Sequence, residues 1–228
     1  MIRIEKEGSP HPALRYEKNS CSQKMNDDLL PPLPQELSGV NQDNSQDKKV
    51  LVANGPFGLA KGIKREEFDI AIKEVQPCVF HAETLPKKHS AFQYYFMRIT
   101  PVQGLAWIKA VGINTQTNPY GYELRGAFDE MKEKLQKIYG KPELVDFLMH
   151  DSIWKDARDW MQAIQSGERS LFAQWENKGN TQLPSNLQSV FLYASAQDSY
   201  SGSIMIEYAF DNIDAANQEI AMLEDDAL

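Results

Sequence analysis

The hydrophobic pattern is most regular in the middle of the chain, over Tyr122–Tyr139. Its apolar residues recur at intervals of four, three, four and three: Leu124, Phe128, Met131, Leu135 and Ile138. This spacing places them on one face of an α-helix. On the opposite face, Glu130 stands four residues before Lys134, a favourable ion-pair spacing. Gly140 and Pro142 follow, as is typical after the end of a helix.

Shorter patterns predict three more helices and six strands. The predicted helices are Lys64–Val75, in which Phe68, Ile72 and Val75 have helical spacing, Ile153–Gln165, and Asp214 to about Asp225. The predicted strands are Cys78–Leu85, Phe92–Thr100, Gly104–Ile113, Ser170–Glu176, Gln188–Ala196 and Ser203–Phe210.

The two halves of this pattern are alike, since each has a helix followed by three strands joined by short turns. We therefore expect an α+β fold of two tandem α-β-β-β units, with repeat one at about 56–114 and repeat two at about 121–228. Short turns favour an antiparallel sheet with helices on one face. A C-terminal helix completes the predicted domain, which covers residues 51–228.

Residues 1–50 have a different composition. They hold five of the twelve prolines and end in a polar run over 41–47. No apolar period is sustained here, so we expect an extended or disordered Pro-rich arm. Within it, residues 29–34 (Leu-Leu-Pro-Pro-Leu-Pro) favour polyproline II, either as a stiff spacer or as a docking peptide for an aromatic groove.

The charge of the chain is concentrated at its C-terminal end. The formal net charge is −8, and no lysine or arginine follows Lys178. The last 50 residues carry eight acids, which leaves 24 acids and 24 bases before them. The negative electrostatic potential of this end favours binding of a basic partner and disfavours binding of nucleic acid and anionic membranes.

Other features point to a cytoplasmic protein. The cysteines, Cys21 and Cys78, lie far apart, and neither needs a partner in a domain of this size. The first residues lack the basic-then-apolar pattern of a signal peptide, and no apolar run reaches the 18 or so residues that a membrane span needs.

Candidate catalytic chemistry is sparse. His81-Ala82-Glu83 is similar to the first half of a zinc-deaminase signature, but no Pro-Cys-x-x-Cys follows it. His89 could complete a set of two histidines and one glutamate across a turn. A metal-dependent hydrolase using His81, Glu83 and His89 is therefore an alternative, while the main interpretation assigns no catalytic residue, metal or cofactor.

Aromatic residues occupy four of five consecutive positions in one predicted strand. Phe92, Tyr94, Tyr95 and Phe96 put rings on both of its faces. One of these faces must then meet the second half of the protein or a partner.

Four segments carry a resemblance to known proteins: Pro56–Leu59, Gly104–Gly112, Tyr139–Pro142 and Ile206–Phe210. Over residues 52–228 the chain resembles a family of uncharacterised bacterial cytoplasmic proteins. Its topology is also similar to the beta-lactamase-inhibitor-protein-like fold. That resemblance implies binding of other proteins without catalysis, and it assigns no functional residues.

Together these features favour a non-enzymatic module that binds a basic protein, as an immunity, inhibitor or defence-associated protein would. The candidate partner-binding residues are Asp211, Asp214, Glu219, Glu224, Asp225, Asp226 and Tyr200. Two alternatives stay open: the acids only keep the protein soluble, or the chain is a subunit of a larger complex docked through residues 1–50.

Overall fold

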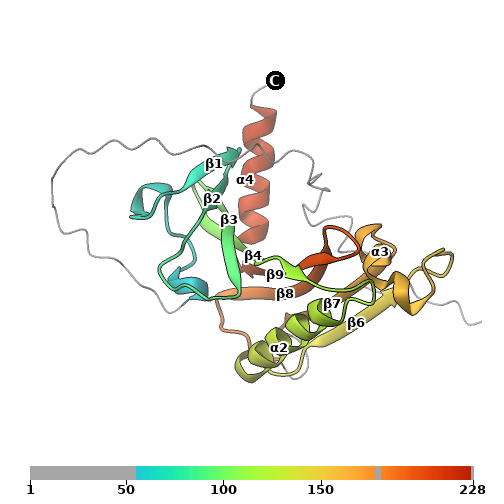
Figure 1. Cartoon of the computed structure of the whole chain (residues 1–228). Coiled ribbons are helices and arrows are strands. Elements are labelled where there is room, and N and C mark those ends of the chain that lie inside the picture. Colours follow the sequence, from blue (N-terminus) through green and yellow to red (C-terminus); the bar gives the residue numbers. More distant parts are fainter. Residues whose placement is uncertain (1–54, 178–180, 227–228) are drawn as a thin grey trace, which may run out of the picture. The chain divides into compact units, whose positions relative to one another are not determined.

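The computed structural model describes residues 55–177 and 181–226, and these form an α+β domain around one antiparallel sheet (Figure 1). The predicted fold class is confirmed. The predicted arm over residues 1–50 lies outside the described residues. The strands are β1 (Lys73–Gln76), β2 (Val79–Ala82), β3 (Phe92–Thr100), β4 (Gly104–Gly112), β5 (Thr115–Gln116), β6 (Glu143–Leu148), β7 (Arg169–Glu176), β8 (Leu187–Ala196) and β9 (Ser201–Phe210). The helices are α2 (Tyr122–Tyr139), α3 (Trp160–Gln165) and α4 (Ile213–Asp225), and 3-10 turns lie at Pro56–Gly58, Arg65–Glu67 and Ala157–Asp159.

The sheet consists of two four-stranded meanders joined by their last strands. Its order is β1-β2-β3-β4-β9-β8-β7-β6, with the short β5 also paired to β9. The β4–β9 junction is antiparallel, and Ile108 lies opposite Tyr208. At the level of the strands, the two halves are thus arranged like the tandem units that the sequence predicts, although each has four strands in place of three.

One face of the sheet forms the hydrophobic core together with α2 and α3. The apolar stripe of α2 buries Leu124, Phe128, Met131 and Leu135 as predicted. In the last turn Tyr139 is buried and Ile138 is exposed, because four residues after Leu135 continue the stripe better than three. Each large side chain buried in this way contributes about 1.5–3 kcal/mol.

The predicted helix over Lys64–Val75 is wrong. A 3-10 turn, an extended segment and β1 occupy this range. Its half-buried apolar residues are Phe68, Ile70 and Ile72, which pack on the core, whereas the residues between them are exposed. An alternation of every second residue is typical of an extended chain. Phe68 and Ile72 are also four residues apart, which suggested a helix when Ile70 was left out of the pattern. Between Gly55 and the start of β1, the described chain therefore contains 3-10 turns but no α-helix.

The start of one helix and the presence of one strand also differ from prediction. The predicted helix Ile153–Gln165 is helical only from Trp160, after a 3-10 turn at Ala157–Asp159. The strand β6 was missed, because as an edge strand it exposes residues on both faces and shows no alternation of apolar and polar positions.

The C-terminal helix α4 lies on the sheet face opposite α2 (Figure 1). Its buried residues Ile213 and Ala216 pack on Ala106, Trp107 and Ala209. Trp107 and Ala209 are directly opposite each other on β4 and β9, so their side chains share a face. Their neighbours Ile108 and Tyr208 point the other way, into the core.

Polar contacts fasten α4 to the β3–β4 turn. The Asn212 side-chain amide donates to the carbonyl of Gln103 at 3.0 Å. The Glu219 carboxylate accepts from the Thr100 hydroxyl at 2.5 Å and from the N–H groups of Val102 at 2.6 Å and Gln103 at 3.0 Å. Glu219 therefore satisfies three donors of the turn that joins the two strands.

We predict that Glu219→Ala lowers the free energy of unfolding by about 2 kcal/mol, because it removes the charged acceptor of three hydrogen bonds. Denaturant unfolding measures this loss. Gln218→Ala, at an exposed and uncharged position of the same helix, is the matched control and should change the free energy by less than about 0.5 kcal/mol.

The effect of Glu219 should also depend on pH. Burial raises the pKa of this carboxyl, but the hydrogen bonds from Thr100, Val102 and Gln103 outweigh burial, and the net pKa lies below the ordinary value of 4.5. A lowered pKa in the folded state stabilises the fold above about pH 4.5, and this stabilisation is lost as the pH falls through the folded-state pKa. The difference in the free energy of unfolding between the wild type and Glu219→Ala should therefore shrink as the pH falls below about 4.5. A difference that stays constant as the solution is acidified would contradict this assignment.

Candidate functional site

The sheet face opposite α2 and α3 carries a row of half-buried aromatic side chains. Alternation along each strand puts them there, since their neighbours fill the core. We call this surface the open face and define it by Tyr94, Phe96, Trp107, Phe172, Phe191 and Tyr193. Among the described residues, α4 is the helix that packs on this face, at the end formed by Ala106 and Ala209.

The rings of the open face form two clusters. On β7 and β8, the ring centroids of Phe172 and Phe191 are 5.0 Å apart, and those of Phe191 and Tyr193 are 5.4 Å apart. On β2 and β3, the His81 ring lies 5.5 Å from Tyr94 and 5.4 Å from Phe96. Such spacings are favourable for edge and offset ring contacts.

A polar network on β4, β8 and β9 separates the two clusters. The Glu207 carboxylate accepts from the Trp107 indole N–H at 3.2 Å and from the Tyr193 hydroxyl at 3.1 Å. The Lys109 ammonium lies 3.6 Å from the same carboxylate and 5.6 Å from the centroid of the Tyr193 ring. The charges at the centre of the open face are therefore paired with each other.

The sequence indicated this surface only in part. The successive aromatics of β3 predicted a ring-bearing face directed at the other half or at a partner, and Tyr94 and Phe96 do lie on the face opposite the core. The contributions of Trp107, Phe172, Phe191 and Tyr193 were missed. Their signal was present, because each alternates with a core residue of its strand, but only the topology shows that β4, β7 and β8 share this face with β3.

The residues of the alternative metal site do not converge. His81 lies on β2 against open-face rings, and burial lowers its pKa, which favours the neutral imidazole. Glu83 is exposed beyond the end of β2. His89 lies in the β2–β3 loop, where its ring contacts Phe92 and its Nδ1 accepts from the Ala91 N–H. Over residues 55–177 and 181–226, no group of three or more histidines, cysteines or acids could hold a metal ion.

Three of the predicted partner-binding acids have partners within the chain. Asp211 forms an ion pair with Lys61 at 2.7 Å, and Asp214 accepts from the Gln188 side-chain amide at 3.3 Å. Glu219 holds the β3–β4 turn, as described above.

The last three acids, Glu224, Asp225 and Asp226, are exposed at the end of α4, where the last turn contains no basic residue. The adjacent Met222 and Leu223 are exposed as well. We call these five residues the α4 tip. It combines negative charge with apolar surface.

Tyr200 is not brought together with these acids. It is exposed in the hairpin between β8 and β9, where its carbonyl accepts from the Thr117 N–H at 2.8 Å. The ten residues of β9 separate this hairpin from the start of α4. At about 3.3 Å per residue, that distance is roughly 30 Å.

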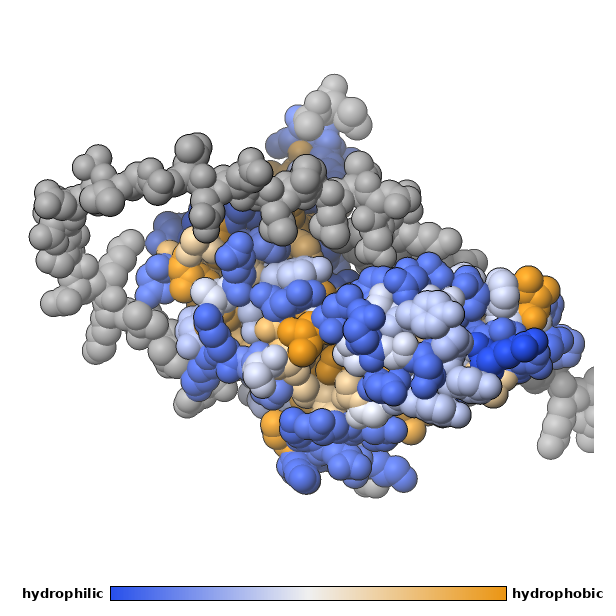
Figure 2. Space-filling model, viewed as in Figure 1, coloured by the Kyte–Doolittle hydropathy of each residue, from blue (hydrophilic) through white to orange (hydrophobic). Residues whose placement is uncertain are grey.

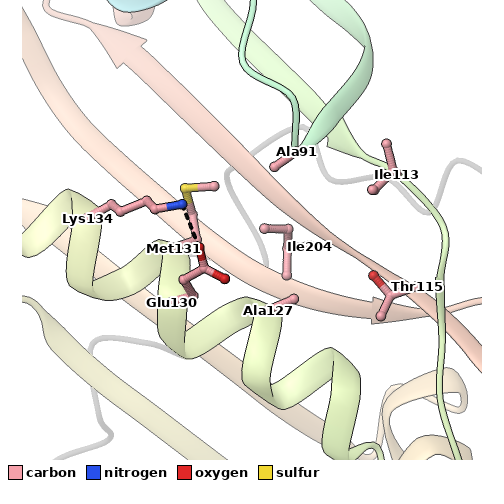
Figure 3. A pocket seen from close by; sticks show the side chains of 8 residues that line it. All are labelled: Ala91, Ile113, Thr115, Ala127, Glu130, Met131, Lys134 and Ile204. Carbon is pink, nitrogen blue, oxygen red and sulfur yellow. Dashed lines mark hydrogen bonds and ion pairs between the residues drawn. The ribbon is translucent and has the colours of Figure 1, made fainter.

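A small hollow lies between α2 and the ends of the central strands (Figure 3). Its volume is about 110 Å³. Apolar side chains line most of it, and Glu130 and Lys134 form an ion pair at 2.7 Å on the α2 side. It is smaller than the roughly 300–1,000 Å³ of ordinary ligand sites. In the view of Figure 2 the surface is mostly hydrophilic, with apolar residues in separate patches.

Comparison of the chain with protein-family models, with curated proteins and with solved structures found no match. The resemblance stated from the sequence therefore stays a prediction. No helix in the described part of the chain has the length and apolar character needed to cross a membrane.

We predict that Glu207→Ala lowers the free energy of unfolding by about 1–3 kcal/mol, because the Trp107 N–H loses its acceptor and Lys109 its counter-charge. Glu207→Gln keeps an acceptor oxygen and should lose less. Chemical denaturation measures both. Glu133→Ala, at an exposed position of α2, serves as the control. Equal effects at Glu207 and Glu133 would show that the network contributes nothing.

Proposed function

We propose that this protein is a non-enzymatic binding module that holds a basic partner protein on the open face of its sheet. The observation that carries the proposal is the half-exposed aromatic surface on the side from which α4 rises. A protein that acts by covering a surface of its partner could serve as an immunity, inhibitor or defence-associated protein in the cytoplasm.

The aromatic rings would supply most of the affinity. Aromatic side chains are enriched among the few residues that dominate protein interfaces, since they bury a large area at a small cost in conformational entropy. Phe172 and Phe191 are suited to this role because they contact each other and are both half-buried. Because Lys109 and Glu207 are paired with each other, a docked partner would not have to compensate either charge.

The α4 tip would steer the basic partner. Its acids stand at the C-terminal end of a helix, which already carries a partial negative charge. Each acid there costs about 0.3–1 kcal/mol at low ionic strength, and a cationic partner would relieve that cost. Because α4 packs on the same face as the rings, its field acts on a protein that approaches this face.

The proposed steering residues are Glu224, Asp225 and Asp226, with Asp214 as a further candidate. Asp211 and Glu219 have partners within the chain and are assigned structural roles. Tyr200 lies too far from the α4 tip for a small contact to include both.

We predict that the double variant Phe172→Ala, Phe191→Ala weakens partner binding at least tenfold at both low and high salt, because it removes neighbouring apolar anchors. The measurement is retention of the partner from an extract of the native host, followed by titration of the purified pair. Glu130→Gln with Glu133→Gln, on the outer surface of α2, is the control. Unchanged affinity in the double aromatic variant would overturn the open face as the binding surface.

We predict a different effect for Glu224→Gln, Asp225→Asn and Asp226→Asn together. Association should slow by about tenfold at low salt and lose most of its salt dependence, while the dissociation rate stays close to wild type, since steering charges act before contact. Stopped-flow or surface-based kinetics over a salt series measure both rates. An association rate equal to wild type at low salt would assign the acids to solubility alone.

A further inference from the structure

The outer edge of β6 has no strand partner among the described residues, because β6 ends the sheet order and pairs with β7 alone. From the features of this edge we propose that β6 pairs antiparallel with β6 of a second copy of the chain, so that two sheets become one around a twofold axis.

Backbone geometry shows which groups of β6 are available. The Met149 N–H donates to the Glu168 carbonyl on the β7 side at 2.8 Å. Because backbone groups alternate in direction along a strand, the N–H and C=O groups of Leu144, Asp146 and Leu148 point outward. These three residues provide up to six hydrogen bonds to an added strand.

The two edges of the sheet differ in how they are protected. The other edge, β1, has four residues and an irregular register between Glu74 and Gln76. Short edges, irregular register and charged residues such as Lys73 normally prevent unwanted strand pairing. By contrast, β6 pairs regularly over six residues and contains neither lysine nor proline. Its side chains Leu144 and Phe147 are 52% and 55% exposed.

The sequence of β6 is suited to a copy of itself. Residues 144–148 read Leu-Val-Asp-Phe-Leu, which is symmetric in polarity about Asp146. An isologous interface requires such self-complementarity. With Asp146 on the axis, Leu144 lies opposite Leu148 of the second copy and Val145 opposite its Phe147. All three outward-facing residues then oppose outward-facing residues, so every available hydrogen bond can form.

The acid on the axis has a cation beside it in each chain. The Asp146 carboxylate accepts from the Arg169 guanidinium, with N–O distances of 2.8 and 2.7 Å. Arg169 also lies 5.9 Å from the centroid of the Trp160 ring, which helps to hold it in place. Two carboxylates and two guanidinium groups therefore meet at the axis, and their charges balance.

The flanking residues favour the same register. With Asp146 on the axis, the exposed Lys141 comes opposite the exposed Asp151 of the second copy. Centring the pair on Val145 would place Leu144 opposite Asp146 and Glu143 opposite Phe147, and would form fewer hydrogen bonds. The register centred on Asp146 is therefore preferred.

The test measures the oligomeric state of the full chain by sedimentation and light scattering over a wide concentration range. We expect a reversible dimer. Leu144→Pro removes an outward-facing donor without breaking a bond to β7, and Phe147→Lys places a charge in the interface. Each should raise the dimer dissociation constant at least tenfold. Val75→Lys, at a 45% exposed position of β1, is the control and should leave the constant unchanged. Circular dichroism verifies that each variant is folded.

A cross-link tests the register. In a chain whose native cysteines are replaced by serine, Asp146→Cys puts two cysteines on the axis, with Cα atoms about 5.5 Å apart, within disulfide range. It should oxidise to a covalent dimer, whereas Val75→Cys should not. A monomer at all concentrations, a dimer insensitive to both β6 substitutions, or β6 paired with residues 1–54 or with another protein would overturn the proposal.

Discussion

The antiparallel pairing of β4 with β9 is the contact on which the domain depends, because it joins the two meanders into one sheet. The strands approach their surroundings closely at two glycines. A Cβ atom at Gly112 would lie 2.4 Å from the Ile204 carbonyl oxygen, and one at Gly202 would lie 2.5 Å from the Leu124 side chain. The first glycine permits close packing at the junction, and the second lets α2 lie against β9. Without this pairing, each meander would expose a long edge of unpaired backbone N–H and C=O groups.

The two faces of the sheet differ in how the helices cover them: one forms the buried core, and the other is the half-buried open face. The helix α2 begins the second half and packs on β8 and β9, while α4 ends that half and packs on β3 and β4 of the first half. The helix α2 thus covers strands of its own half, whereas α4 covers strands of the first half from the opposite side of the sheet. The main core lies beneath α2 and α3, whereas α4 buries only Ile213 and Ala216, against Ala106, Trp107 and Ala209. In the described part of the chain, α4 packs at one end of the open face, whose rings are half-buried.

Features set by residues close together in the sequence could be predicted, whereas features set by contacts between distant segments could not. The α2 helix and the long strands were predicted closely, since their periodicity reports burial on one face. The segment around Ile70 was misread because two of its apolar residues also have helical spacing. The β6 strand was missed because neither face of this edge strand is buried, so its sequence shows no alternation of apolar and polar residues. At the candidate site, the acids could be counted from the sequence. That Glu219 bonds to a turn 116 residues away, and that Trp107 and Tyr193 share one carboxylate, follow only from the topology.

The central junction also constrains how the chain is made. Trp107 pairs with Ala209, so β4 leaves the ribosome about 100 residues before its neighbour exists. At 5–20 residues per second, the nascent first half waits roughly 5–20 s with an incomplete sheet. Such distant pairings also slow folding itself. During synthesis, β4 therefore stays without its β9 neighbour until most of the second half has been made.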